Sequence, residues 1–141
     1  SISINELIKE CLKNLSKEKY LINFKAIDHV KTSGRPVQLK RAFQNIIDNC
    51  KRYGDKIEIV IFINENGCNI EISDNGQGIP PENYEDVFKP FFTLDPSRNK
   101  LKGESGLGLT ITRDIIRSHG GEIKLGVSDL GGLKLSVLLP I

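Results

Sequence analysis

The stretch KIEIVIFINENGCNIEISDNGQGIP, residues 56–80, decides the fold. In residues 56–63 every second residue is isoleucine, and residues 68–74 alternate apolar and polar side chains in the same way. This period of two, with many β-branched residues, is typical of strands. Asn66-Gly67 between them is the strongest short signal for a β-hairpin. The stretch therefore predicts two antiparallel strands joined by a tight turn.

A carboxylate ends the second of these strands. The alternation of Cys68, Ile70 and Ile72 puts Asp74 in the same phase as the apolar side chains. An ionised group that points toward a core is costly unless something there binds it. The turn sequence DNGQGIP follows at once. From the residues alone, Asp74 has either a structural partner or a place in a pocket that is built for a ligand.

The elements on both sides of this hairpin indicate an α+β fold. We expect one mixed, mainly antiparallel sheet that is covered by helices on one face, because hairpin-joined strands alternate with helices. Residues 80–105 are irregular, with a short helical possibility around Tyr84 to Phe88. The other expected elements are a helix from Ser3 or Asn5 to about Leu15, a strand within residues 20–27, a helix from about Val37 to Tyr53, a helix from about Gly106 to His119 that Gly120-Gly121 ends, and strands at 122–127 and 133–139.

Bulk composition fits one globular domain, residues 1–141. The apolar content of 38% and the charged content of 27% are ordinary, and the net charge of +2 comes without a basic tail that would indicate nucleic acid. The three cysteines have no metal-ligand spacing, which favours a reduced intracellular setting. No apolar run approaches membrane-spanning length. A start without methionine suggests a piece of a longer protein.

The middle helix carries a polar edge beside its core face. Asn45, Asn49 and Arg52 follow one another at spacings of four and three, which stacks them along one side of the helix. Asparagine is a mediocre helix former, so two on one stripe need a reason. The edge is either a solvent-exposed border or a place where amide oxygens coordinate a hard cation such as Mg²⁺. The core face is expected to contain Leu39, Phe43, Ile46, Ile47 and Cys50.

Two glycine-rich segments and one aromatic segment follow the polar edge along the chain. The glycines of DNGQGIP allow close backbone approach to a flat ligand, although such a sequence is a plain turn in most proteins. GESGLGLTI, residues 103–111, places glycines directly before a helix, where exposed N–H groups bind phosphate. VFKPFFTLD, residues 87–95, is interpreted as a hydrophobic anchor for one end of the irregular segment.

In this order, the four segments resemble the N, G1, F and G2 boxes of the catalytic, ATP-binding domain of sensor histidine kinases, in the GHKL ATPase superfamily. The likeness covers nearly the whole chain, and LKRAFQNIIDNCKRYG and GGLKLSVLLP are similar to the osmosensor-class, EnvZ-like kinases. The resemblance implies a two-layer α/β sandwich, the Bergerat fold, with ATP between the helical layer and a flexible lid.

The resemblance also implies a role for individual residues. Asn49 matches the residue that coordinates Mg²⁺, with Asn45 as its partner, and Arg52 matches the basic residue near the phosphates; these three are the predicted catalytic residues. Asp74 matches the aspartate that accepts a hydrogen bond from the adenine amino group. The further predicted ATP-binding residues are Tyr53, Gly76, Gly78, Ile79, Phe91, Arg98, Gly103, Ser105, Gly106, Leu107, Gly108 and Leu109, with Lys100 and Lys102 beside Arg98 in the lid.

By the same resemblance, the chain binds Mg-ATP and donates the γ-phosphoryl group to a histidine on the dimerisation domain of its parent kinase. A response regulator is the expected next partner, the parent is expected to be a homodimer with this part in the cytoplasm, and the chain alone is expected to be monomeric. A GHKL-type hydrolase is a second reading, which Asn45 disfavours because it stands in place of the water-activating glutamate. A nucleotide-binding module without kinase activity is a third, which the intact Asn49 and Asp74 disfavour. Neither His29 nor His119 has the context of a phosphoacceptor, and Cys50 and Arg35 stand where alanine and aspartate are usual.

Overall fold

The computed structural model describes residues 1–13, 15, 19–90, 92 and 108–141, with the backbone alone for Arg52 and Tyr53. In chain order the elements are β1 (Ile2–Ser3), α1 (Ile4–Leu12), β2 (Leu21–Ala26), β3 (Lys31–Thr32), α2 (Pro36–Tyr53), β4 (Lys56–Asn64), β5 (Gly67–Asp74), the 3-10 turns η1 (Pro81–Asn83) and η2 (Asp86–Phe88), α4 (Gly108–Ser118), β6 (Glu122–Val127) and β7 (Leu133–Leu139). None of the helices in this described part is long and apolar enough to cross a membrane.

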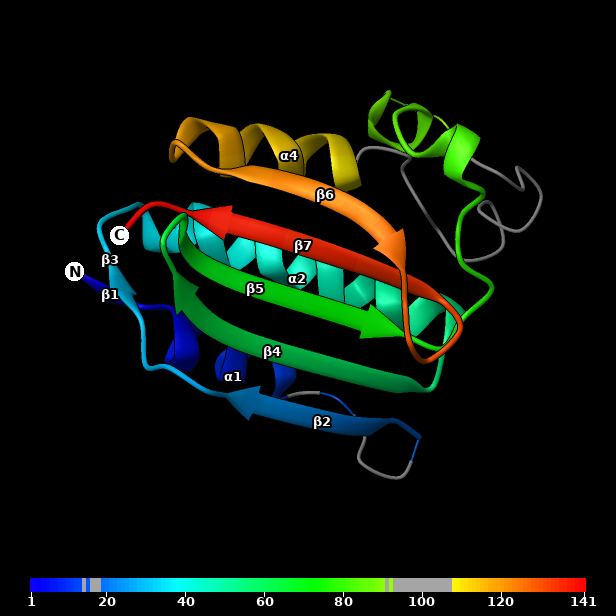
Figure 1. The fold of residues 1–141 in the computed structure, drawn as a ribbon, viewed down its shortest axis with the longest axis horizontal. Coiled ribbons are helices and arrows are strands. Elements are labelled where there is room, and N and C mark those ends of the chain that lie inside the picture. Colours follow the sequence, from blue (N-terminus) through cyan, green and yellow to red (C-terminus); the bar gives the residue numbers. More distant parts are fainter. Residues whose placement is uncertain (14, 16–18, 91, 93–107) are drawn as a thin grey trace.

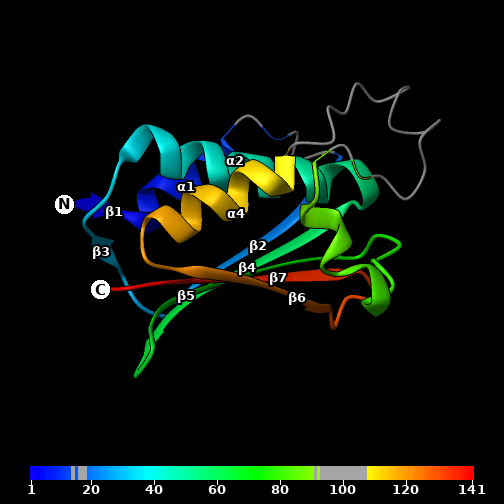
Figure 2. The ribbon, with the colours of Figure 1, turned by 90° about the horizontal axis from the view of Figure 1, so that it is seen from above.

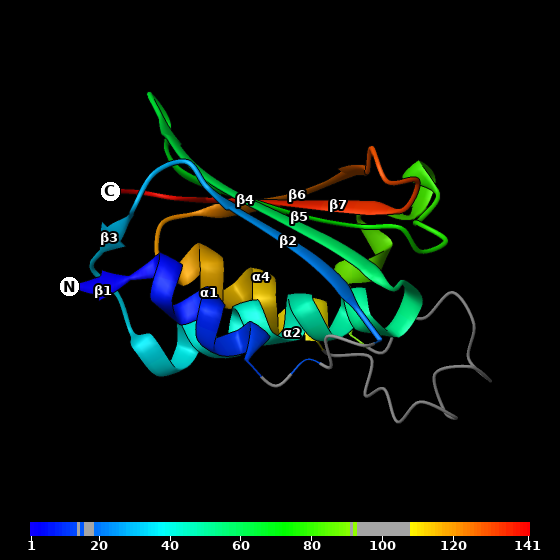
Figure 3. The same ribbon diagram turned by 90° about the horizontal axis from the view of Figure 1, so that it is seen from below.

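A five-stranded sheet with the order β2-β4-β5-β7-β6 forms one layer, and α1, α2 and α4 lie together on one face of it (Figures 1 and 2). β2 runs parallel to β4, and the other neighbouring strands are antiparallel. The predicted α+β architecture is therefore confirmed. Both termini lie at the end of the molecule where β1 and β3 pair (Figures 1 and 3).

The central hairpin forms as predicted, but its turn lies one residue earlier than the sequence signal. Asn64 pairs with Gly67, so Glu65 and Asn66 are the two loop residues and Gly67 begins β5. Gly67 has φ +131°, and a Cβ there would lie 2.5 Å from the carbonyl oxygen of Leu139 on β7. Glycine is therefore needed at this position because β7 approaches it closely.

Helix periodicity correctly predicted which side chains form the core. The expected core face of α2 is fully buried, and Ala42 joins it. α1 begins after Ser3, whose Oγ accepts a hydrogen bond from the Glu6 N–H, and it ends at Leu12 rather than near Leu15. Asn5 does not cap this helix; it is buried, and its amide binds the backbone of Asp28 and Val30.

The ends of α2 and α4 are fixed to each other at the side of the termini. Arg35 makes no side-chain cap for α2; instead its N–H donates to Nε2 of His119 (3.0 Å) and its guanidinium donates to Oγ of Ser118 (2.6 Å). α4 ends at Ser118, one residue before the predicted end, and Gly120 takes φ +81°. The predicted start at Gly106 lies outside the described residues. The short helix expected around Tyr84 to Phe88 is the 3-10 turn η2.

Candidate functional site

Four parts of the fold meet at the end of the molecule opposite both termini. They are the C-terminal half of α2, the last residue of β5, the N-terminus of α4 and the loop between β6 and β7 (Figure 1). Helix α2 packs against both α4 and β5, so residues on one helix reach the other two elements. The N and G1 boxes contribute to this end, as do residues 108–111, the described part of the G2 box.

The polar edge of α2 reaches the first residue of α4. Asn45 and Asn49 are half-buried, between the fully buried core face and the exposed side of the helix. Nδ2 of Asn45 donates to the carbonyl oxygen of Gly108 (3.3 Å), which also accepts from Oγ1 of Thr112 (2.8 Å). An amide whose nitrogen donates in this way keeps its oxygen as an acceptor or a metal ligand. Asn45 therefore links the two helices and retains one ligand atom.

The side chains of Asn45 and Asn49 can bind a magnesium ion only if water and nucleotide phosphates supply the rest of its ligands. Among the described residues, no group of three or more His, Cys, Asp or Glu side chains is placed to hold a metal ion. Mg²⁺ prefers oxygen ligands, keeps several waters, and is usually bound through a few protein groups together with substrate phosphates. The donor set thus suits a cation that is shared with a nucleotide and does not suit a permanent metal cage.

Asp74 lies inside, as the strand phase predicts. Its side chain is 2% exposed. Oδ1 accepts two backbone hydrogen bonds, from the N–H of Gly76 (2.9 Å) and from that of Leu133 (3.1 Å). The carbonyl oxygen of Asp74 accepts a third, from the N–H of Gly132 (3.2 Å). The first alternative that the sequence left open is therefore observed: the carboxylate has structural partners, and both of its backbone N–H donors bind Oδ1.

Cys50 of α2 lies against the same carboxylate. Its side chain is fully buried. Burial raises the pKa of the Cys50 thiol well above its usual value, and the charge of Asp74 and a hydrogen bond to it raise this pKa further. The thiol therefore stays protonated and can donate its S–H to Asp74. A residue that the sequence assigns only to the core face also contacts the candidate site.

The turn after Asp74 is fixed to the link between α2 and β4. Oδ1 of Asn75 accepts from the N–H groups of Asp55 (3.0 Å) and Lys56 (2.9 Å), and its Nδ2 donates to the Asp55 carboxylate (2.8 Å). A Cβ on Gly54 would lie 2.6 Å from Oδ1 of Asn75, so only glycine leaves room for this amide. Gly78 has φ +73°, in the left-handed region that favours glycine.

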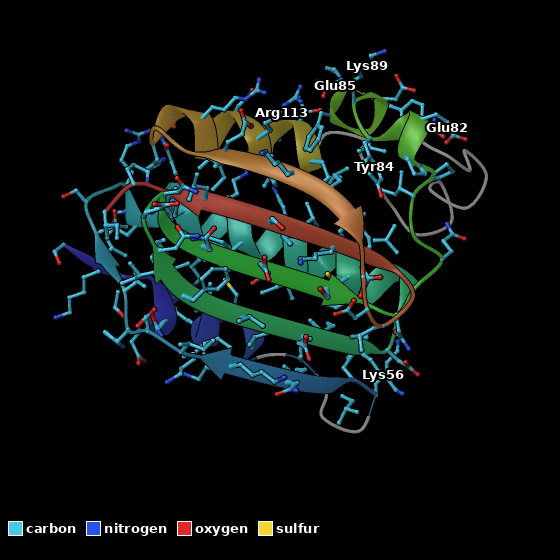
Figure 4. All side chains as sticks on the ribbon, in the orientation of Figure 1. Lys56, Glu82, Tyr84, Glu85, Lys89 and Arg113 are labelled. Atoms are coloured by element: carbon cyan, nitrogen blue, oxygen red, sulfur yellow. The ribbon has the colours of Figure 1, made fainter. Side chains whose placement is uncertain are left out.

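The start of the F-box segment is anchored to α4 at Phe88, as the predicted hydrophobic anchor requires, whereas Phe91 and residues 93–95 lie outside the described residues. Phe88 is buried, and its carbonyl oxygen accepts from Oγ1 of Thr110 (2.6 Å). The guanidinium of Arg113 lies 4.2 Å from the centroid of the Phe88 ring and donates to Glu85 (2.7 Å). Figure 4 shows Arg113 on α4 extending toward Glu85. Arg113 was not predicted as a functional residue, because a single arginine on a helix gives no signal of its partner.

The remaining predicted residues divide into two groups. Gly76 and Gly78 are half-buried in the turn after β5, and Ile79 and Leu109 are half-buried and pack against the core. The second group lies outside the described residues. It consists of the side chains of Arg52 and Tyr53 and of eight residues: Phe91, Arg98, Lys100, Lys102, Gly103, Ser105, Gly106 and Leu107.

Residues 34–141 match the family described as histidine kinase-, DNA gyrase B-, and HSP90-like ATPase. The chain belongs to this family. It is 39% identical over 109 residues to the sensor histidine kinase CpxA of Escherichia coli (strain K12), which is 77% of this chain and 24% of CpxA. The chain therefore spans only about a quarter of the length of this curated relative.

Solved structures show the same fold. The mycobacterial sensor histidine kinase MprB superposes with a TM-score of 0.86 over 99% of this chain and 95% of that one, at 23% identity. The histidine kinase domain of the E. coli osmosensor EnvZ superposes with a TM-score of 0.73 over 99% of this chain and 87% of that one, at 30% identity. The resemblance inferred from the four boxes is confirmed. The chain is an ATP-binding catalytic domain of the sensor histidine kinase type.

Proposed function

We propose that this domain binds Mg-ATP at the end of β5 and donates the γ-phosphoryl group to a histidine on the dimerisation domain of its parent kinase. The observation that carries the proposal is the buried Asp74 carboxylate, which the backbone holds by one oxygen. Both backbone N–H groups donate to Oδ1. Oδ2 is therefore the oxygen that we propose accepts a hydrogen bond from the adenine amino group.

In this proposal the triphosphate extends from the base toward the polar edge of α2. The amide oxygens of Asn49 and Asn45 hold Mg²⁺ together with phosphate oxygens and water, as the small number of protein ligands requires. Arg52 lies near the phosphates and Tyr53 beside the adenine. Gly108 and the glycines before it contribute backbone N–H groups to the phosphates, since these groups have no partner within the first turn of a helix.

The proposed reaction is a phosphoryl transfer in which the domain positions ATP and neutralises charge. An imidazole nitrogen of the acceptor histidine attacks the γ-phosphorus, the bond to the β–γ bridging oxygen breaks, and ADP leaves. Bound Mg²⁺ would supply charge neutralisation on the phosphates. The chain's own residues bind the base, orient the phosphates and supply the amide ligands.

The acceptor is proposed to be on another domain because the two histidines here have structural partners. Nδ1 of His119 donates to the carbonyl oxygen of Ile115 (2.8 Å), and its Nε2 accepts from the N–H of Arg35 (3.0 Å). Both ring nitrogens are thus in use, so neither is free to attack a phosphate. Nε2 of His29 pairs with Oγ of Ser3 (3.2 Å), the last residue of β1. In Figure 1, β1 lies at the end of the molecule with the termini, opposite the C-terminal end of β5.

The hydrolase alternative needs a general base one turn before Asn49, and the chain has Asn45 there. An amide does not accept a proton at neutral pH, and the Asn45 nitrogen is held by Gly108. We therefore propose phosphotransfer within a two-component system. A response regulator, a homodimeric parent and a cytoplasmic location for this domain belong to the same proposal.

Two measurements test this function. A fluorescent ATP analogue should bind the chain more tightly with Mg²⁺ than with a chelator. The chain with labelled ATP should give neither self-phosphorylation nor appreciable phosphate release, whereas adding the parent's helical acceptor domain should give acid-labile phosphohistidine. Absence of nucleotide binding would refute the proposal, and rapid phosphate release by the chain alone would favour the hydrolase.

A further inference from the structure

The loop between β6 and β7, residues 128–132, holds Asp74 from the side opposite to its own turn. Leu133, the first residue after the loop, donates its N–H to Oδ1 of Asp74 (3.1 Å), and Gly132 donates its N–H to the Asp74 carbonyl oxygen (3.2 Å). The loop thus binds both the side chain and the backbone of the same residue. From the sequence, these residues are predicted only to link two strands, and Gly131 and Gly132 begin the stretch that is similar to EnvZ-like kinases.

This loop has an internal hydrogen-bond network of its own. Ser128 is 4% exposed, and its Oγ accepts from the N–H of Leu130 (2.9 Å). The Ser128 N–H donates to the carbonyl oxygen of Gly132 (2.9 Å), and its carbonyl oxygen accepts from the N–H of Gly131 (3.0 Å). Because these bonds close the loop on itself, the positions of the two N–H groups that bind Asp74 are set before any ligand arrives.

Gly132 is required for space. A Cβ on this residue would lie 2.5 Å from the backbone nitrogen of Gly76 and 2.6 Å from the carbonyl oxygen of Asp74, and it would also meet Oδ1 of Asp74. Two of these three atoms belong to backbone that cannot rotate out of the way. The backbone of Gly132 does not take a positive φ, so its conformation alone would accept another residue. What excludes a side chain is the close approach of the loop to Asp74.

We propose that Gly132 is a positioning residue for the nucleotide base: it lets the β6–β7 loop close on Asp74, so that the N–H of Leu133 joins that of Gly76 on Oδ1 and the two together fix the direction of Oδ2. The inference rests on the proposed function, since it assumes that Oδ2 accepts from the adenine amino group. A carboxylate that is free to rotate presents neither oxygen at a defined place. Gly132 therefore determines base selectivity through Asp74, without contacting the base itself.

Three glycines of the same hairpin allow a matched test. Gly132→Ala introduces the clash. Gly131→Ala introduces backbone strain, because Gly131 has φ +98°, but no clash, because its Cβ would meet nothing within 4 Å. Gly126→Ala on β6 introduces neither. For each folded variant, ATP and GTP compete against one fluorescent nucleotide, and thermal unfolding is measured in parallel.

We expect Gly132→Ala to weaken ATP binding about tenfold or more and to bring the ratio of ATP to GTP affinity close to one. Gly131→Ala should lower the melting temperature and keep the wild-type ratio, and Gly126→Ala should behave as wild type. A merely structural role predicts a different pattern, in which selectivity follows the melting temperature across the three variants. That pattern would overturn the inference.

A second variant decides the matter if Gly132→Ala does not fold. Ser128→Ala removes the acceptor for the Leu130 N–H without adding atoms, and we expect it to reduce the ATP preference several-fold. If the wild type prefers ATP and the Gly132 or Ser128 variant keeps the full preference, this inference is refuted, whereas the proposed function stands. A wild type that binds neither nucleotide refutes the proposed function as well.

Discussion

Replacing Asp74 by asparagine tests base recognition while keeping the shape of the side chain. In wild type, Oδ1 accepts from the N–H groups of Gly76 (2.9 Å) and Leu133 (3.1 Å). In the variant these two donors should select the amide oxygen, because an amide nitrogen in its place would set donor against donor. The NH₂ group then occupies the place of Oδ2. The variant thus presents a donor to the base where the wild type presents an acceptor.

The expected size of the effect follows from the burial of this residue. The adenine amino group is a donor and pairs with a carboxylate oxygen, whereas the corresponding position of guanine carries an acceptor. A buried polar group without a partner costs roughly 1–3 kcal/mol, and more if it is charged. Since about 1.4 kcal/mol corresponds to a factor of ten, the wild type should prefer ATP over GTP about tenfold to a hundredfold. Asp74→Asn should bind ATP at least about tenfold less tightly and lose most of this preference.

Competition of ATP and GTP against one fluorescent nucleotide measures both quantities. Asp129→Asn is a suitable control, because it makes the same change of charge at an exposed residue of the β6–β7 loop. Equal affinity of the wild type for ATP and GTP would refute the reasoning, and so would full ATP preference in a folded Asp74→Asn variant. Either result would make the inward carboxylate a structural feature with no part in base recognition.

Three further predictions concern the metal, the lid and the thiols. Asn49→Ala should abolish most Mg²⁺-dependent ATP binding, as measured by titration with a fluorescent ATP analogue. The control Asn23→Ala, at an exposed position of β2, should bind ATP as the wild type does. Unchanged ATP affinity of the Asn49→Ala variant would contradict the proposed magnesium site. Residues 94–103, which lie outside the described residues, are predicted to form a lid over the phosphates, so saturating Mg-ATP should slow tryptic cleavage there, and equal cleavage with and without it would contradict this. Burial raises the pKa of Cys50 well above its usual value and that of the other two thiols to about 11, so at pH 7 none should react with Ellman's reagent until denaturant is added. Rapid reaction of the folded chain would contradict their burial.

The fold was predictable because its main signals are local. Alternation in residues 56–63 and 68–74 gave the central hairpin, and the 3.6-residue period of α2 gave a core face that is fully buried. The short pairing of β1 with β3 was missed, because two-residue strands are too short to show a period. The end of α1 was placed too far along because Leu15 is buried and continues the apolar pattern after the helix has ended.

The site was predictable only in part, because some of it consists of backbone. The phase of Asp74 and the spacing of Asn45 and Asn49 are visible in the sequence. The N–H of Leu133 that binds Asp74 is not, since a backbone donor has no side-chain signature. Gly54 and Gly132 owe their importance to contacts with distant segments, which a single sequence does not reveal.

These hidden contacts explain how a core strand can end in a charged residue. Asp74 continues the buried row of Ile70 and Ile72, where an apolar side chain would serve folding at least as well, since burying a carboxylate is costly. The chain compensates with two N–H groups on one oxygen and a protonated thiol nearby, and it omits Cβ atoms at Gly54 and Gly132 so that the backbone can come close enough. Such a set of compensations at the end of a single strand favours binding over stability as its purpose. The conflict between the strand pattern and its last residue is therefore the strongest support for the proposal that the nucleotide base binds beside Asp74.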